Sequence, residues 1–335
     1  MTAQYPPTQS KNSTRVPAHR AGTAAIIGLP NSGKSSLFNA LLGSSLSIVT
    51  PKPQTTRDQI RGVLDRKEGQ IVFIDTPGFL RESAESSGKR DGLASYMIHQ
   101  TEQALEGLDV LVYLVDPGST LERETLVVDR LVSGILDKNT QIILAVTKAD
   151  RVHDAETKSK VGILKSKIKS RLVSETASEG KRAVHETTVS IRNLRQLGSF
   201  SKLLFSLIPE GPALFPKDTL TDRPTRFFAS EYIREQLFLA THQEIPYSCA
   251  VVIDEFREST SVTHIRARII LERESQKPIV IGKQGLVLKQ VGTRARKRIE
   301  KLIGGKVFLD LHATVRPDWS RTNGGLQFAG YKEHA

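Results

Sequence analysis

The stretch GLPNSGKSSLFNALLG, residues 28–43, decides the fold of the N-terminal half of this 335-residue chain. It opens with the pattern G-x-x-x-x-G-K-[ST], in which two glycines, a lysine and a serine hold the fixed positions. The apolar run TAAII, residues 23–27, comes before it, and a segment with helical spacing follows. A strand, a glycine-rich loop and a helix in this order predict a loop whose main-chain N–H groups bind a polyphosphate.

The side chains of this loop have separate expected roles. Lys34 is expected to reach the β- and γ-phosphates of a nucleotide, and Ser35 to offer its hydroxyl to Mg²⁺. We expect the nucleotide to contact the residues Gly28, Asn31, Ser32, Gly33, Lys34, Ser35 and Ser36. A phosphate-binding loop alone leaves the choice between ATP and GTP open.

A carboxylate follows the next apolar run, IVFI at residues 71–74. There Asp75 begins the motif DTPG, where a carboxylate at the end of a strand can hold Mg²⁺ through a water molecule. The N–H of Gly78, at the end of the same motif, is expected to lie beside the γ-phosphate.

The segment PKPQTTRD, residues 51–58, lies between these two motifs and is predicted to be the first switch. One of its threonines would bind Mg²⁺ and sense the γ-phosphate; Thr55 and Thr56 both fit, and we prefer Thr56. The expected Mg²⁺ ligands are Ser35, Thr56 and Asp75. The expected catalytic residues are Lys34, Thr56, Asp75 and Gly78.

A third motif, TKAD at residues 147–150, follows the apolar run at residues 142–146 and selects the base. The Asp150 carboxylate can accept both N1–H and N2–H of guanine, a pair of donors that adenine does not offer. The stem of Lys148 can lie along the purine face. The sequence therefore predicts GTP as the nucleotide and adds Thr147, Lys148 and Asp150 to its expected contacts.

The order of elements divides the chain into two units. Apolar runs at residues 24–27, 71–74, 110–115 and 142–146 alternate with helix-length segments, which predicts an α/β domain with a largely parallel sheet and helices on both faces. Glycine and proline then mark a linker, and an α+β unit follows. In its helix after Gly285, apolar residues recur at steps of three and four.

Charge locates the surface that binds a partner. The chain has a formal net charge of +12. Residues 277–306 hold nine Lys or Arg against one acid, which favours a polyanionic partner at the C-terminal unit. The single cysteine, Cys249, excludes an internal disulfide and is expected to be a buried thiol. No run of eighteen apolar residues or signal peptide is found, so we expect a cytoplasmic protein.

The turn Gly282-Lys283-Gln284-Gly285 matches the GxxG loop with which KH domains clamp a single-stranded nucleic-acid backbone. Two glycines let the backbone approach phosphates closely, and a lysine supplies charge. The basic helix that follows supports this interpretation. The expected RNA contacts are Gly282, Lys283, Gln284, Gly285, Lys289, Arg294 and Lys297.

These motifs together resemble the Era family of bacterial GTPases, over about residues 22–319. The resemblance rests on GLPNSGKS, KPQTTR and DTPG, and in the second unit on TDR at 221–223, PYS at 246–248, SQK at 275–277 and IVIGKQG at 279–285. It implies a type II KH domain as the second unit. It also implies slow GTP hydrolysis coupled to binding of the 3′ end of 16S rRNA during assembly of the 30S subunit, and peripheral association with the inner membrane.

The expected domain boundaries combine this resemblance with the composition of the chain. They are a disordered basic tail at 1–20, a G domain at 21–208, a linker at 209–220, a KH domain at 221–319 and a C-terminal tail at 320–335. We expect a monomer.

Three positions, Thr147, Ile191 and Phe79, depart from familiar GTPase patterns. Thr147 stands where the family has asparagine, so we expect weaker guanine affinity with selectivity kept by Asp150. Ser190 and Ile191 are expected to form the last nucleotide-binding loop, in place of a Ser-Ala pair. Phe79 follows DTPG and has no group that orients a water molecule. Similar GTPases with an asparagine like Asn31 are helped by K⁺, so we expect K⁺ to accelerate hydrolysis through Asn31.

Two other functions remain open from the sequence. Phe79 and the altered base loop also fit a non-catalytic, GTP-gated RNA-binding module. The basic C-terminal face also fits a membrane-associated signalling GTPase.

Overall fold

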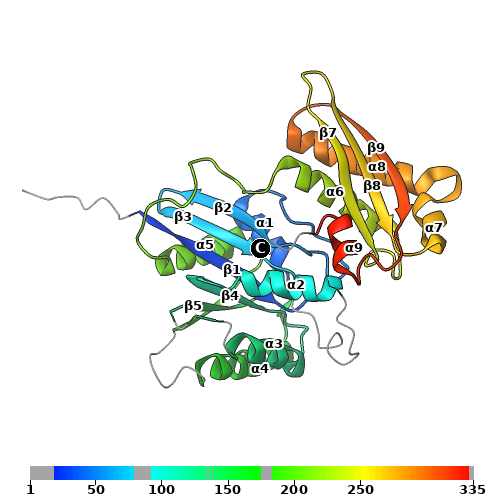
Figure 1. The fold of residues 1–335 in the computed structure, drawn as a ribbon. Coiled ribbons are helices and arrows are strands. Elements are labelled where there is room, and N and C mark those ends of the chain that lie inside the picture. Colours follow the sequence, from blue (N-terminus) through cyan, green and yellow to red (C-terminus); the bar gives the residue numbers. More distant parts are fainter. Residues whose placement is uncertain (1–18, 79–91, 134–135, 138, 175–182, 332–335) are drawn as a thin grey trace, which may run out of the picture.

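The chain forms two folded units that lie side by side in a computed structural model (Figure 1). The structure describes residues 19–78, 92–133, 136–137, 139–174 and 183–331. Most of the expected N-terminal tail, and Phe79 after the DTPG motif, lie outside these residues.

A six-stranded sheet in the order β2-β3-β1-β4-β5-β6 forms the centre of the first unit. The strands are β1 (Arg20–Gly28), β2 (Ile60–Arg66), β3 (Gly69–Asp75), β4 (Val110–Val115), β5 (Gln141–Val146) and β6 (Val184–Thr188). β2 runs antiparallel to β3, and the other neighbouring strands are parallel. The predicted α/β unit with a largely parallel sheet is confirmed.

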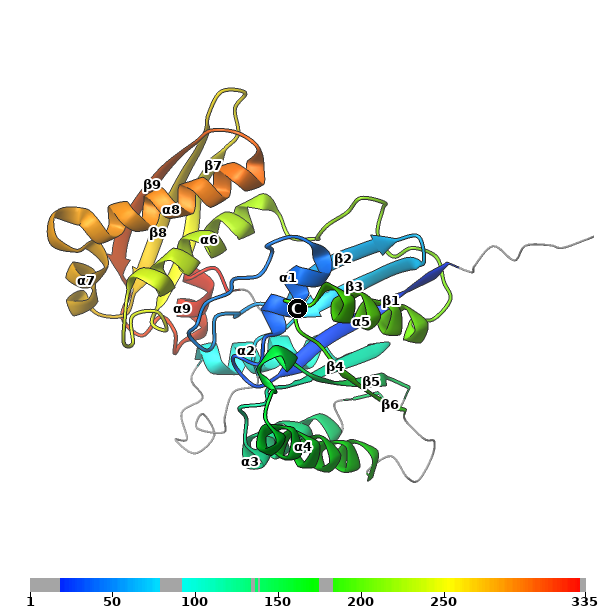
Figure 2. The ribbon, with the colours of Figure 1, turned by 180° about the vertical axis from the view of Figure 1, so that it is seen from behind.

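Helices cover both faces of this sheet. They are α1 (Lys34–Leu42), α2 (Gly92–Gln103), α3 (Leu121–Val132), α4 (Ala155–Ser174) and α5 (Leu194–Leu207). α1 and α5 lie on one face and α3 and α4 on the other (Figure 2). Val112 packs in the core on the side of α1 and α5, and its neighbour Tyr113 packs in the core on the side of α3 and α4. Because both faces of β4 are covered, the strand is a continuous apolar run. None of the helices in the described part of the chain is long and apolar enough to cross a membrane.

The second unit has a three-stranded sheet in the order β7-β8-β9. Its elements are α6 (Thr225–Ala240), β7 (Cys249–Arg257), β8 (Thr263–Leu271), α7 (Lys277–Ile281), α8 (Leu286–Ile303), β9 (Val307–Val315) and α9 (Asn323–Phe328). β7 and β8 are antiparallel, whereas β8 and β9 are parallel. α6 and α8 pack on one face of the sheet, through Phe228 and Ala295 among others, and α9 lies on the other face.

The linker between the units is held against the first sheet. The Gln70 side chain accepts hydrogen bonds from the main-chain N–H groups of Leu214 and Phe215, at 2.9 and 2.8 Å. Farther along, the N–H of Val63 donates to the carbonyl of Leu220 at 2.9 Å. The linker is therefore fixed over much of its length.

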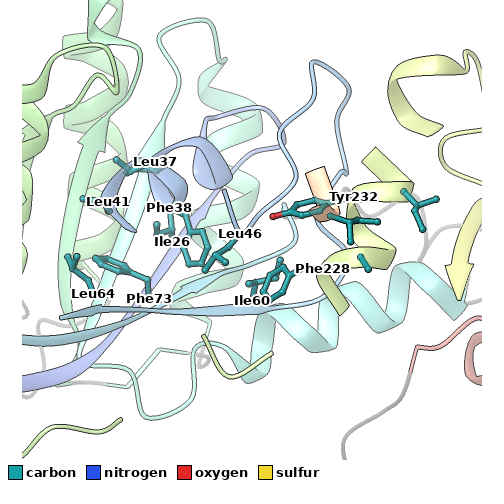
Figure 3. Packing of buried hydrophobic residues seen from close by; sticks show 14 of the residues in the cluster. Ile26, Leu37, Phe38, Leu41, Leu46, Ile60, Leu64, Phe73, Phe228 and Tyr232 are labelled. Carbon is teal, nitrogen blue, oxygen red and sulfur yellow. The ribbon is translucent and has the colours of Figure 1, made fainter. Parts of the chain in front are cut away.

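The two units also share buried side chains. Figure 3 shows Leu46 and Ile60 of the first unit facing Phe228 and Tyr232 of α6. The Tyr232 hydroxyl donates to the carbonyl of Ser45 at 2.9 Å. The packing therefore continues from the first unit into the second.

The expected C-terminal tail is folded over much of its length. Trp319 is fully buried, and α9 and Tyr331 pack with it between α2 of the first unit and the outer face of the second sheet. In Figure 1 this red segment lies between α2 and the sheet of the second unit. The C-terminal residues thus complete the contact between the two units.

Candidate nucleotide-binding and RNA-binding sites

A pocket of about 350 Å³ lies at the N-terminus of α1 and includes the phosphate-binding loop and the predicted first switch. Two glycines give the loop its shape. Gly33 has φ of 98° directly before α1, and a Cβ on Gly28 would lie 2.6 Å from the carbonyl oxygen of Leu114. A larger residue would be strained at position 33 and would collide with Leu114 at position 28, so the loop needs both glycines.

Lys34 is buried at the floor of this pocket. Its Nζ donates to the carbonyls of Gly28 and Leu29 at 3.2 and 3.0 Å. Burial lowers the pKa of this amine to about 8, although the carboxylates of Asp75 and Glu124 oppose the shift. A nucleotide phosphate would supply the negative charge that a buried lysine needs.

Ser35, Thr56 and Asp75 converge beside it. The Ser35 hydroxyl donates to Asp75 Oδ2 at 2.7 Å and lies 3.0 Å from Thr56 Oγ1. Asp75 is fully buried, which raises the pKa of its carboxyl, and its Oδ1 has no hydrogen-bond partner among the described residues. Two hydroxyls and a carboxylate oxygen that lacks a partner fit a Mg²⁺ ion, which prefers oxygen ligands.

The geometry also distinguishes the two switch threonines. Thr55 Oγ1 donates to the Lys52 carbonyl at 2.9 Å, whereas Thr56 faces Ser35. This arrangement favours Thr56 as the switch threonine.

Gly78 and Asn31 lie at the edge of the same pocket. A Cβ on Gly78 would lie 3.2 Å from Lys34 Nζ, so its main chain closely approaches that amine. The Asn31 side chain donates to the carbonyl of Pro51 at 3.4 Å, and the main-chain carbonyl of Asn31 accepts a hydrogen bond from Lys148 Nζ at 2.8 Å.

A second pocket, of about 200 Å³, adjoins the first and shares Gly33, Ser36 and Lys148 with it. Asp150 lies in its wall and accepts a hydrogen bond of 2.6 Å from Ser190 Oγ. That bond is the main reason why the pKa of Asp150 is lowered. A carboxylate kept ionised in this pocket suits the two N–H donors of guanine.

Thr147 still ties the base pocket to the phosphate loop. Its hydroxyl donates to the carbonyl of Ser32 at 2.9 Å and lies 3.2 Å from that of Val115. A threonine at this position therefore still makes a side-chain link to the main chain of the phosphate loop. Ile191 lies in the same pocket, with 47% of its surface exposed.

The sequence did not point to two residues of this site. Ser47 donates to Asp75 Oδ2 at 2.5 Å, and no pattern around it marks that role. Asp116 accepts a hydrogen bond from Lys148. Asp116 directly follows β4, so a search for polar residues at strand ends would have found it.

The glycine-flanked turn of the second unit lies between α7 and α8. Gly282 and Gly285 both have φ of 76°, and Gln284 has φ of 53°. A Cβ on Gly282 would lie 2.5 Å from Val287, whereas one on Gly285 meets no atom within 4 Å. The turn is thus tightly folded on one side and open on the other, with Lys283 and Gln284 exposed.

The basic residues of α8 are on its exposed side. Val291, Ala295 and Ile299 are buried, and the exposed cations include Lys289, Arg294 and Lys297. The residues predicted to contact RNA therefore lie on one turn and on the exposed side of the helix that follows it.

Comparisons with known proteins match both units of the chain. A family model described as 50S ribosome-binding GTPase matches residues 23–148, and one described as KH domain matches residues 244–320. GTPase Era of Carboxydothermus hydrogenoformans is 37% identical over 318 residues, 94% of this chain and 99% of the relative. GTPase Era of a Geobacter species is 38% identical over 93% of this chain and 98% of the relative.

Two solved structures are similar to this chain over most of its length. One is Era in complex with MgGDPNP and nucleotides 1506–1542 of 16S ribosomal RNA, and the other is a variant of Aquifex aeolicus Era bound to GDP and AlF4⁻. Each has a TM-score of 0.80 and 33% identity, and covers 93% of this chain and 99% of its own. The chain belongs to the Era family of GTPases, with a P-loop GTPase domain followed by a KH domain.

Proposed function

We propose that this GTPase hydrolyses GTP slowly with Mg²⁺, and that its nucleotide state controls binding of the 3′ end of 16S rRNA during assembly of the 30S subunit. One observation carries the proposal. The oxygen ligands Ser35, Thr56 and Asp75 converge in the first unit, and the GxxG turn lies open in the second. A 33% identical Era with both units was solved with MgGDPNP and a 16S rRNA segment.

The roles in hydrolysis follow from the pocket. Lys34 places positive charge beside the phosphates, and the main chain at Gly78 lies close enough to offer its N–H to the γ-phosphate. Ser35, Thr56 and Asp75 would hold Mg²⁺, which neutralises charge that develops on the phosphate oxygens. Slow hydrolysis is expected because Phe79 offers no group to orient the attacking water.

K⁺ is proposed as an activator through Asn31. The Asn31 side chain contacts the Pro51 carbonyl of the switch, so a cation bound there would lie between the loop and the switch. We expect faster single-turnover hydrolysis in K⁺ than in Na⁺ for the wild type, and equal rates for Asn31→Ala. Equal rates for the wild type would contradict the proposal.

The RNA site is proposed to bind a single strand by its backbone. The open side of the turn lets phosphates approach Gly285, and Lys283 adds charge. Along α8, Lys289, Arg294 and Lys297 would contact further phosphates, which predicts a strong dependence of affinity on salt.

Nucleotide and RNA binding measured together test the proposal. Asp150→Asn should remove the preference for GTP over ATP and, at nucleotide concentrations that saturate the variant, leave RNA binding intact, because its pocket lies in the first unit. Gly285→Asp should abolish RNA binding and keep the preference for GTP over ATP, because it places a negative charge on the RNA turn. Loss of both activities in either variant, or no RNA binding by the wild type, would contradict the two-site assignment.

Cytoplasmic location, peripheral membrane contact and the monomeric state stay predictions from the sequence. Binding to anionic liposomes that survives Lys283→Asp, without preference for the 3′-terminal rRNA sequence, would favour the membrane-signalling alternative.

A further inference from the structure

Arg57 belongs to the predicted first switch, yet its side chain is buried in the second unit. Only 2% of it is exposed. Its Nη1 donates to the carbonyl of Cys249 at 2.7 Å and to the Tyr331 hydroxyl at 2.8 Å. Its Nη2 donates to the carbonyls of Tyr247 and Pro246 at 2.8 and 3.2 Å. A guanidinium with four acceptors is fixed in position by the KH domain.

A second switch cation reaches the same part of the KH domain. Lys52 Nζ donates to the carbonyls of Phe238 and Thr241, at the C-terminus of α6. A cation is favourable there because the last carbonyls of a helix lack partners and carry partial negative charge. Together, Lys52 and Arg57 bind carbonyls of residues 238–249, which we call the KH hinge segment, since it joins α6 to β7.

The residue before Arg57 faces the opposite way. Thr56 lies 3.0 Å from Ser35 Oγ in the nucleotide pocket, while Arg57 lies between the KH hinge segment and Tyr331. One peptide bond therefore separates a proposed Mg²⁺ ligand from a residue held by the KH domain. Thr56 cannot leave the pocket by much without moving the main chain of Arg57.

Helix α2 of the first unit also contacts Tyr331. The Tyr96 hydroxyl of α2 donates to the carboxylate of Asp58, and the Tyr96 ring packs edge-on against the Tyr331 ring, with 5.4 Å between the ring centroids. The Tyr331 ring in turn stacks on the Trp319 ring, with 5.9 Å between the centroids. The first switch, through Arg57, and α2, through Tyr96, thus both contact Tyr331.

From these contacts we propose that Arg57 is a positioning residue that couples Thr56 to the KH domain. When Thr56 is held at the nucleotide, Arg57 keeps the KH hinge segment in the arrangement seen here. When Thr56 is released, the guanidinium must leave acceptors that are costly to bury unpaired. Because coupling between two sites is reciprocal, RNA on the KH domain changes GTP affinity by the same factor.

The first test follows the KH hinge segment without RNA. In the wild type, we expect hydrogen exchange of main-chain N–H groups in residues 238–249 to differ between the GDP and the GDPNP complexes. Arg57→Ala should remove the difference. Arg57→Lys should restore it only in part, because an ammonium lacks the fork that binds several carbonyls at once. Tyr331→Phe, which removes one acceptor and keeps the ring, should reduce it without unfolding the protein.

The matched control is Tyr232→Phe. It deletes another hydrogen bond between the two domains, to Ser45, outside residues 51–58 of the switch. It should leave the nucleotide-dependent difference in exchange unchanged. GDP affinity and thermal midpoints of all variants show whether each remains folded. An unchanged difference in Arg57→Ala, its absence in the wild type, or its loss in Tyr232→Phe would overturn the proposal.

The second test rests on the proposed function, because it measures RNA affinity in both nucleotide states. Coupling of this kind typically changes affinity by about 5–150-fold. In Arg57→Ala we expect the ratio of the RNA affinities in the two nucleotide states to fall to within about twofold of one. A wild type that binds no RNA would contradict the proposed function, while the exchange experiment would still decide the role of Arg57. Equal RNA affinities in both states of a binding-competent wild type would overturn the coupling alone.

Discussion

The Thr147 hydroxyl donates a hydrogen bond of 2.9 Å to the main-chain oxygen of Ser32, although the two residues are 115 positions apart. This bond joins the strand end that carries the base-reading motif to the phosphate loop. It is made by a residue type that differs from the asparagine of the resembled family, so its value to nucleotide binding can be measured directly.

Thr147→Val keeps the shape of the side chain and removes this donor. We expect the dissociation constant for GDP to rise by about 3–10-fold, the effect of one hydrogen bond, while the preference for GTP over ATP remains with Asp150. Fluorescent nucleotide titration measures both quantities, with Thr147→Asn as the control that restores an amide. Unchanged GDP affinity in Thr147→Val would show that the bond is unimportant.

The lowered pKa of Lys34 predicts a pH effect on stability. In the unfolded chain its pKa is near 10.5, whereas burial lowers it to about 8 in the folded chain. Between these pH values the unfolded chain binds more protons, so Lys34 makes the free energy of unfolding of the nucleotide-free protein rise with pH. Denaturant titrations from pH 8 to 10 check this sign against Lys34→Arg, which stays charged throughout.

The same lysine predicts proton uptake when nucleotide binds. Phosphate oxygens favour the charged amine, so GDP binding at pH 9 should be accompanied by proton uptake. Calorimetry in two buffers with different ionisation enthalpies detects that proton, and Lys34→Arg should show a smaller dependence on buffer. Binding enthalpies that do not depend on the buffer for the wild type would contradict the prediction.

Ser35 and Ser47 donate to the same oxygen of Asp75 and form a matched pair. Only Ser35 also contacts Thr56, so only Ser35 is placed to bind Mg²⁺. We expect Ser35→Ala to raise the Mg²⁺ concentration needed for half-maximal hydrolysis by more than about tenfold, and Ser47→Ala by about threefold or less. Equal effects in the two variants would remove the assigned difference.

Gly282 and Gly285 both have φ of 76°, but ψ is 169° at Gly282 and 10° at Gly285. Gly285→Ala should cost about 1–2 kcal/mol of unfolding free energy, because alanine is strained in the left-handed helical region. Gly282→Ala should cost about 1–3 kcal/mol more, because its backbone lies in a region that only glycine adopts readily and its Cβ would lie 2.5 Å from Val287. Chemical denaturation measures both losses, and equal losses in the two variants would contradict this prediction.

The sequence predicted the central strands of the first sheet and missed its edges. The apolar runs at 24–27, 71–74, 110–115 and 142–146 lie within β1, β3, β4 and β5. β2 and β6 are the outer strands, and β6 (VHETT) has no fully buried residue. A strand that is covered less needs fewer apolar residues, so its pattern is weaker.

The site shows a similar division. Motifs at strand ends placed Lys34 and Asp150 in adjoining pockets, and Asp75 behind the first pocket with a hydrogen bond from Ser35, because parallel strands bring their ends to one edge of a sheet. The partners of Arg57 and the packing of Trp319 depend on contacts between segments far apart in the chain. No local spacing carries that information, so the structure was needed to find them.

The place of Trp319 and Tyr331 has a consequence for how the protein is made. A ribosome synthesises the chain from its N-terminus, and domains generally fold in that order. The nucleotide pocket can therefore form on a nascent chain, but Arg57 gains its acceptors only after residues 246–331 have been added. Until then, such a chain would bind guanine nucleotides without the contacts that we propose to couple them to the KH domain.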